Sequence, residues 1–241
     1  MTAANEITFK PNLSFLSRDG KNKIHQSAMK ILGDIGMKIL HEEALALLKN
    51  AGCDVTEDGT VKIPQDLVQN AVESAPSNIL IFDREGNQTM DLGGYRAYYG
   101  TGSDLIFSLD SEKMERHQCV LDDVSRAARV SDALPNIDFI MSFAHPSDCP
   151  PKRAYLLSFQ AMAANSVKPI VCTAQNREDL NEMWEIARIL RGGAEPLRSK
   201  HYFIHYAEPI SPLKHPPDSL NKLLFCAEKF VPVIYSCLLY T

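Results

Sequence analysis

The second half of the sequence repeats one unit, an apolar stretch followed by an amphipathic stretch, about every 30 residues. The apolar stretches begin near Ile137, Pro169, Phe203 and Pro232. A span of about 30 residues accommodates one strand, one covering helix and two short loops. Strands that read as continuous apolar runs are buried on both faces, as parallel strands under helices are. The repeat therefore predicts parallel strands joined by crossover helices.

Two architectures fit this pattern, an open doubly wound sheet or a (β/α)8 barrel, because crossovers are right-handed. The expected strands are 98–109, 136–148, 168–175, 202–209 and 231–236, and the expected helices are 121–135, 153–166, 177–193 and 217–230. No G-x-G-x-x-G sequence stands between a strand and a helix, which disfavours the dinucleotide-binding open sheet. We predict an α/β fold in which residues 96–241 form a partial (β/α)8 TIM-type barrel.

Residues 1–95 have a different rhythm and predict an N-terminal α+β scaffold region. Apolar residues recur at helical spacing over 24–35 and stop at Gly36, and a second amphipathic helix spans 42–52. Asp58-Gly59 predicts the turn of a short hairpin. A further helix follows Pro64, and 78–84 reads as a strand. Nothing in this region indicates chemistry.

The composition is that of an ordinary globular protein. The 241 residues are 45% apolar and 23% charged, with a net charge of −5, which argues against a nucleic-acid-binding face. No run reaches the roughly 18 apolar residues of a membrane span, and the N-terminus lacks a signal core. Six cysteines without a C-x-x-C pair predict reduced, mostly buried thiols in a cytoplasmic protein. They are Cys53, Cys119, Cys149, Cys172, Cys226 and Cys237.

Polar and aromatic residues follow several of the expected strands, where chemistry gathers in either parallel architecture. Aromatic rings beside a carboxylate suit a quaternary ammonium ion, which donates no classical hydrogen bond and is held by ring faces and negative charge. The candidate substrate-binding residues are Tyr98, Tyr99, Gly102, Ser103, His145, Tyr206 and Glu208. No catalytic residue is assigned.

Each candidate also has a purely structural interpretation. One of Tyr98 and Tyr99 can be plain core, since neighbours alternate across a strand. His145 can bond a loop carbonyl, and Glu208 can cap the following turn or pair with a lysine. The Gly100–Ser103 stretch can be a tight bend, and it is a weak phosphate cradle. No H-E-x-x-H, clustered Cys/His or G-x-S-x-G is present, so neither a metal site nor a serine hydrolase is expected.

The sequence resembles the trimethylamine methyltransferase family, a cobalamin-dependent group that includes glycine betaine-type members without pyrrolysine. The matching stretches run in order from about residue 23 to 236. They include KIHQSAMKILGDIGMKI, AGCDV, VKIPQDLVQNAVESAP, GTGSDLIFSLD, DDVSRAARVSDALPNIDF, HPSDCPP, VKPIVCTA, GGAEPLRSKHYF and EPISPL. The resemblance implies a (β/α)8 barrel and a methyltransferase of methylamine metabolism.

The resemblance also implies the partners. A small methylated amine would be demethylated at the barrel mouth by the Co(I) of a separate corrinoid protein. The cobalamin would be carried by that partner, and none would be bound tightly by this chain. A quaternary ammonium leaves as a neutral amine and needs no protonation, so the enzyme would mainly orient and desolvate the methyl group.

One departure from the family leaves alternatives open. Family members are about twice as long, so the sequence is expected to represent the N-terminal half, from a truncated or frameshifted reading frame. Half a barrel exposes strand edges and an apolar face, which favours a homo-oligomer or another partner. The alternative function is therefore an inactive half-barrel that binds a ligand or a complementary polypeptide. An unrelated barrel hydrolase or lyase is the third possibility.

Overall fold

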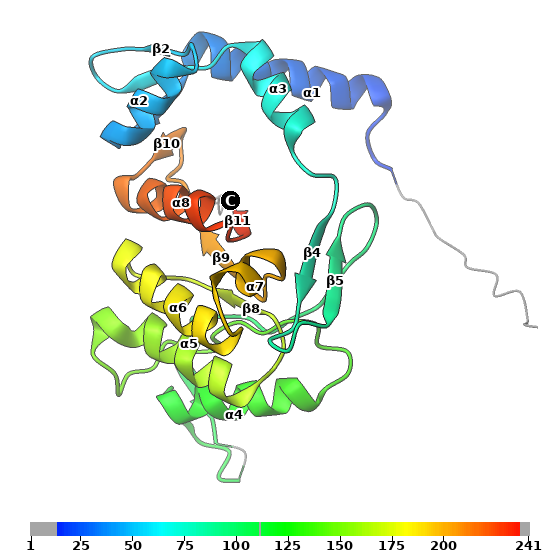
Figure 1. Cartoon of the computed structure of the whole chain (residues 1–241), viewed down its shortest axis with the longest axis vertical. Helices are drawn as coiled ribbons and strands as arrows, with labels where there is room; N and C mark the ends of the chain where they lie inside the picture. The colour runs from blue at the N-terminus through cyan, green and yellow to red at the C-terminus, as the bar shows by residue number, and fades with distance from the viewer. Residues whose placement is uncertain (1–13, 111, 237–241) are drawn as a thin grey trace, which may run out of the picture.

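A computed structural model of the chain describes residues 14–110 and 112–236 (Figure 1). The outer ends of both predicted regions, and with them Cys237, lie outside the described residues. The described cysteines are free thiols, and all of them except Cys149 are buried, as predicted. Within the described ranges, no helix has the length and apolar character needed to cross a membrane.

The N-terminal region folds as helices around a small mixed sheet. Its elements are α1 (Arg18–Lys30), the π-helical turn η1 (Ile31–Ile35), β1 (Met37–Ile39), α2 (Glu42–Asn50), β2 (Asp54–Val55), β3 (Thr60–Lys62) and α3 (Gln65–Ser74). The Ser17 hydroxyl caps α1 by accepting from the Gly20 N–H, and the His41 ring caps α2. Gly36, with a φ of 83°, ends the first helical stretch where the sequence predicts its end.

Between the two regions lies the hairpin of β4 (Ile79–Phe82) and β5 (Gln88–Leu92). The elements that follow are β6 (Phe107–Leu109), β7 (Arg116–Gln118), α4 (Leu121–Ala133), the 3-10 turn η2 (Pro151–Arg153), α5 (Ala154–Asn165), β8 (Ile170–Cys172), α6 (Arg177–Leu190), α7 (Ala194–Ser199), β9 (Phe203–Ala207), β10 (Lys214–His215), α8 (Pro217–Lys229) and β11 (Val233–Tyr235). Helix and strand therefore alternate here as the 30-residue repeat predicts.

Three strands of this second region, β8, β9 and β11, pair in parallel and lie side by side in chain order. β9 lies between β8 and β11, with Cys172 opposite His205 and Val233 opposite the same histidine. Three isolated parallel bridges extend the sheet, Ile140 to Ile170, Gly100 to Phe139 and Leu105 to Ala144. The expected strand 136–148 thus contributes single bridges in place of a continuous strand.

Helices α4, α5, α6 and α8 cover one face of these strands (Figure 1). Phe203 of β9 joins the large helix-covered core, and the fully buried Phe159 of α5 meets it edge-on with ring centroids 5.7 Å apart. The next residue, Ile204, faces the opposite side of the sheet, because side chains alternate along a strand. Successive side chains of β9 therefore pack into two different cores, one on each face of the sheet.

The β4–β5 hairpin covers the second face. Ile81 and Met90 are buried together with Val171 and Ile204 of the parallel strands. The turn end of the hairpin is hydrogen-bonded to the amino ends of those strands, since the Phe82 N–H donates to the His201 carbonyl. The sequence predicts only the first strand of this hairpin, at 78–84.

The structure is mixed α/β, as predicted, but the barrel is not closed. Among the described residues the sheets are small, and β11 has a neighbouring strand on one side only. The expected strand 98–109 is also divided, because its last residues, Phe107–Leu109, form β6 and pair antiparallel with β7, Arg116–Gln118. In addition, β10 does not join the parallel sheet; it pairs with β1 of the N-terminal region.

We predict that Ile81→Ala destabilises the chain strongly. Its side chain is fully buried between the hairpin and the sheet, and removing such a side chain costs about 2–5 kcal/mol. Leu80 lies on the other side of the same strand and is 42% exposed, so Leu80→Ala is the matched control, with an effect below about 1 kcal/mol. Urea unfolding measures both variants, and equal losses would contradict the assigned packing of the hairpin.

Candidate functional site

The carboxyl end of β9 holds a hydrogen-bonded pair of a phenol and a carboxylate. The Tyr206 hydroxyl donates to Glu208 Oε1 over 2.6 Å, a length typical of a hydrogen bond to a charged acceptor. Both side chains are half-buried. Tyr206 packs on the hairpin-covered face, beside the buried Val171 and Ile204. The glutamate that ends this strand is thus oriented by the ring two residues before it.

Tyr98 packs against the same buried residues as Tyr206, but at the other end of the strands. Its hydroxyl accepts a hydrogen bond from the Asp91 N–H of β5 at 2.9 Å. The bridge from Gly100 to Phe139 places Tyr98 before the first paired residue, at the amino end. The prediction that Tyr98 follows the carboxyl end of a strand is therefore wrong: the apolar pattern of 98–109 does not show where pairing begins.

Two residues that the sequence analysis did not select, Phe139 and Met141, complete this face. The Phe139 ring lies so close over Gly100 that a Cβ there would meet it at 2.4 Å. A glycine is therefore required beneath the ring. The spacing of Phe139 and Met141 by two residues was the available signal, since such residues share a face of a strand.

The other residues selected from the first expected strand lie apart from these rings. Tyr99 is 69% exposed, and its N–H donates to Asp138 Oδ2 at 2.7 Å. Gly102 is exposed, and its carbonyl accepts from the Phe143 N–H at 3.0 Å. The Ser103 hydroxyl donates to Asp104 Oδ2 at 2.7 Å.

His145 belongs to a second phenol–carboxylate group, which the sequence analysis missed. Its ring meets Tyr155 of α5 edge-on, with centroids 5.3 Å apart. Burial, followed by the hydrogen-bonded Asp104 carboxylate, raises the pKa of Tyr155. Asp104 and Phe143 have positive φ values of 62° and 59°, a strained conformation that is common at functional sites. The backbone N–H of His145 donates to the Leu105 carbonyl at 3.0 Å.

His205 of β9 is a buried titratable residue on the helix-covered side of the parallel strands. His205 is fully buried, and neither ring nitrogen has a hydrogen-bond partner of good geometry among the described residues. Burial lowers the pKa of His205 to about 3, and the nearby Lys222 ammonium lowers it further, although the Cys172 backbone opposes the shift. Lys222 donates to the Ala174 carbonyl at 2.9 Å, and burial lowers the pKa of Lys222.

Two buried thiols complete this enclosed group. Burial raises the pKa of Cys226 to about 12, and burial together with Cys226 raises the pKa of Cys172. Both thiols are therefore protonated near neutral pH. They form part of the helix-covered core rather than of a reactive site.

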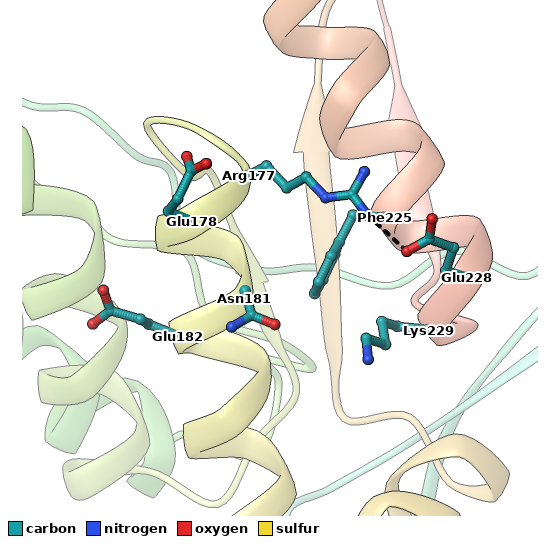
Figure 2. Close-up of a pocket in the computed structure, with 7 residues that line it drawn as sticks. All are labelled: Arg177, Glu178, Asn181, Glu182, Phe225, Glu228 and Lys229. Atoms are coloured by element: carbon teal, nitrogen blue, oxygen red, sulfur yellow. Dashed lines mark hydrogen bonds and ion pairs between the residues drawn. The ribbon is translucent and has the colours of Figure 1, made fainter. Parts of the chain in front are cut away.

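A hollow of about 420 Å³ lies elsewhere, between α6 and α8 on the outer surface (Figure 2). Arg177 reaches across it from α6 to Glu228 of α8, with a separation of 2.8 Å. Its guanidinium lies 5.7 Å from the Phe225 ring centroid, and the Lys229 ammonium lies 4.5 Å from that of Trp184. The protein's own cations thus cover the aromatic faces, which does not favour a cationic ligand at this position.

The Tyr206–Glu208 pair at the carboxyl end of β9 can contact an organic cation through a ring face and a carboxylate. Within the described residues, no group of three or more His, Cys, Asp and Glu side chains is placed to hold a metal ion. Glu208 offers negative charge at the edge of an aromatic face, and the hydroxyl beside it, that of Tyr206, donates its hydrogen bond to this carboxylate. Binding and orientation are what these side chains can provide.

Polar side chains at the carboxyl ends of parallel strands are typical of α/β enzymes. A family model described as trimethylamine methyltransferase (MTTB) matches residues 2–240, nearly the whole chain. The chain belongs to this family, and the resemblance noted from the sequence motifs is confirmed.

The relatives carry methyltransferase names. The chain is 28% identical to the glycine betaine methyltransferase of Desulfitobacterium hafniense (strain Y51), covering 95% of this chain and 47% of that protein. It is 26% identical to the trimethylamine methyltransferase MttB of D. hafniense (strain DSM 10664 / DCB-2), with shares of 87% and 42%. It is also 26% identical to MttB of Methanosarcina thermophila, with shares of 92% and 47%. The chain therefore spans about half the length of these relatives.

We predict that His205→Phe makes the chain less sensitive to acid. The pKa of His205 in the folded chain, about 3, lies below the unfolded value near 6.5, so the unfolded chain takes up the proton first as pH falls. The stability linked to this histidine is complete above pH 6.5 and is lost toward pH 3. Between pH 7 and 5 the wild type should lose about 2 kcal/mol more unfolding free energy than the variant.

Urea unfolding at the two pH values measures this difference directly. Burial also lowers the pKa values of His201 and His215, but both remain in the variant and cancel in the comparison. Equal losses in the two proteins would contradict a buried, neutral His205.

Proposed function

We propose that the chain is part of a methyltransferase that removes a methyl group from a methylated amine, in particular a quaternary amine such as a betaine. Family membership supports the reaction class, and the names of two relatives point to glycine betaine and trimethylamine. The observation that carries the site is the Tyr206–Glu208 pair at the carboxyl end of β9.

The proposed fold is the first part of a (β/α)8 barrel, residues 96–241, preceded by an N-terminal region to about residue 95. Parallel pairing in consecutive order, with helices on one face, supports a barrel over a doubly wound sheet, whose strand order reverses at a switch point. The further strands would come from sequence that the longer relatives have beyond their match to this chain. A cytoplasmic location is part of the same proposal.

The chemistry assigned to this chain is binding and orientation. The trimethylammonium group would lie against the Tyr206 ring, with Glu208 supplying negative charge, because such a cation offers no hydrogen-bond donors. The methyl acceptor is a co-substrate, the Co(I) corrinoid of a separate protein, which supplies the electron pair of the new bond to the methyl carbon. The nitrogen keeps the pair of the broken C–N bond and leaves as a neutral amine, so no protein acid is needed.

A second candidate function is a half-barrel that binds a ligand or a complementary polypeptide without turnover, as a homo-oligomer or with another partner. The open side of β11 among the described residues favours it. Methyl transfer and binding without turnover give different results in the same assay. Cation binding without demethylation, in the presence of the corrinoid partner, would support this candidate and reject the first.

We predict that the protein demethylates at least one quaternary amine when a reduced corrinoid protein is supplied. The measurement is the amine product formed from a panel of betaines, trimethylamine and dimethylamine. Quaternary substrates should react without an added acid catalyst, since their leaving group is neutral. If no quaternary amine yields a demethylated product in the presence of an active corrinoid partner, the proposed substrate class is wrong.

We predict that Glu208→Gln weakens binding of the methylated cation roughly tenfold, the equivalent of about 1.4 kcal/mol. The variant keeps the size of the side chain and removes only its charge. Tyr206→Phe keeps the ring and should weaken binding less. Glu228→Gln is the matched control on the outer surface, where the carboxylate pairs with Arg177, and it should bind as the wild type. Titration calorimetry with glycine betaine measures all four proteins, and equal affinities would contradict a role for Glu208.

A further inference from the structure

The segment from Glu208 to Asn221, here called the strap, connects the proposed site to the N-terminal region. It leaves the carboxyl end of β9, turns back on itself, and enters α8. Ile210 and Lys214 close the turn with two backbone hydrogen bonds, the Ile210 N–H to the Lys214 carbonyl at 2.7 Å and the reverse at 3.0 Å. The strap is therefore an ordered element in its own right.

The N-terminal region holds the strap by its backbone. β1 pairs with β10 in parallel, with Lys38 opposite Lys214. The Lys38 N–H donates to the Leu213 carbonyl at 2.8 Å, and the Leu40 N–H donates to the His215 carbonyl at 3.2 Å. β10 is thus the edge strand of the sheet β10-β1-β3-β2, and in Figure 1 it lies between α2 and α8.

Side chains add to this attachment. Leu220, at the start of α8, is 9% exposed and belongs to the small core of the N-terminal region, with Ile39 and Val61. The His41 ring nitrogen Nε2 lies 2.8 Å from Asn221 Oδ1. The strap thus contacts the N-terminal region through backbone, apolar and polar groups.

The strap also contacts the carboxyl ends of β9 and β11. The buried Ser219 hydroxyl donates to the Glu208 carbonyl at 2.8 Å. The His215 ring stacks on Tyr235 at the end of β11, with centroids 5.6 Å apart and planes 16° apart. The same two rings share a 2.7 Å hydrogen bond between Nδ1 and the hydroxyl.

We propose that Lys38, Leu40 and His41 are positioning residues, which set the place of Glu208 through the strap although they lie about 170 residues away in the sequence. This inference rests on the role in cation binding that is proposed above for Glu208. The reason is physical. Glu208 lies just beyond the last residue of β9, Ala207, and its carbonyl accepts from the Ser219 hydroxyl. Ser219 lies in the first turns of α8, where the next residue, Leu220, is buried in the N-terminal core.

Amide hydrogen exchange on the intact chain tests the attachment without any ligand. The measured quantity is the protection of the Ile210 and Lys214 amides divided by that of the Ile170 amide, which bonds the Tyr202 carbonyl inside the parallel sheet. This ratio should fall at least tenfold in Asn221→Leu, which removes the acceptor near His41, and in Lys38→Pro, which removes the donor to Leu213. A uniform loss of stability lowers both amides and leaves the ratio unchanged.

The controls are matched to the variants. Asn78→Leu makes the same substitution at another hydrogen-bonded asparagine, whose Nδ2 donates to Asp91 Oδ1 of β5, and should leave the ratio as in the wild type. Asn221→Asp keeps an oxygen acceptor for His41 and should restore protection. An unchanged ratio in both Asn221→Leu and Lys38→Pro would overturn the proposal.

Glycine betaine titration then tests the positioning role. In Asn221→Leu and Lys38→Pro the dissociation constant should rise about tenfold, while Asn221→Asp and Asn78→Leu bind as the wild type. A loosened strap with unchanged affinity would overturn the positioning role. A wild type that binds no methylated amine would instead reject the proposed function, and the exchange ratio would still decide whether the N-terminal region holds the strap.

Discussion

The hydrogen bonding of β9 on both edges is the constraint on which the rest of the structure depends. β8 and β11 fix its register, and the register decides which side chains face the helices and which face the hairpin. Phe203 and His205 pack toward the helices, while Ile204 and Tyr206 face the opposite surface. A shift of one residue would exchange the two sets and bring an imidazole among the rings. The place of the proposed site is thus a consequence of backbone pairing.

The two regions of the chain are joined more closely than their sequence patterns indicate. The pattern of the first region predicts a scaffold without chemistry, and none of its described residues forms part of the Tyr206–Glu208 pair. Yet β1 and β10 share a sheet, and Leu220 of α8 is buried in the N-terminal core. The loop that follows β9 therefore belongs to both regions at once. Its conformation reflects the packing of each.

Periodicity predicted the fold where local pattern and burial agree. The helix expected at 177–193 is α6, Arg177–Leu190, and the apolar strand after His201 is β9. The predictions were wrong where strand pairing, rather than the apolar pattern, decides the outcome. Phe107–Leu109 pairs locally with Arg116–Gln118 as a hairpin, and β10 pairs with the distant β1. Tyr155 and Asp104 are about 50 residues apart and meet through the helix–strand packing, which no local spacing reveals. The family was recognisable from the order of the motifs along the chain, although the identity to the glycine betaine methyltransferase is only 28%.

The Lys229 ammonium over the Trp184 ring has a practical consequence. Trp184 is the one tryptophan of the sequence, and it is 8% exposed on α6 while its cation comes from the end of α8. Indole emission depends on nearby charge and on access of water. Any displacement of α8 against its neighbour would change the colour and yield of that emission. The intrinsic fluorescence of Trp184 therefore reports on the packing of α8 against α6 without an added dye.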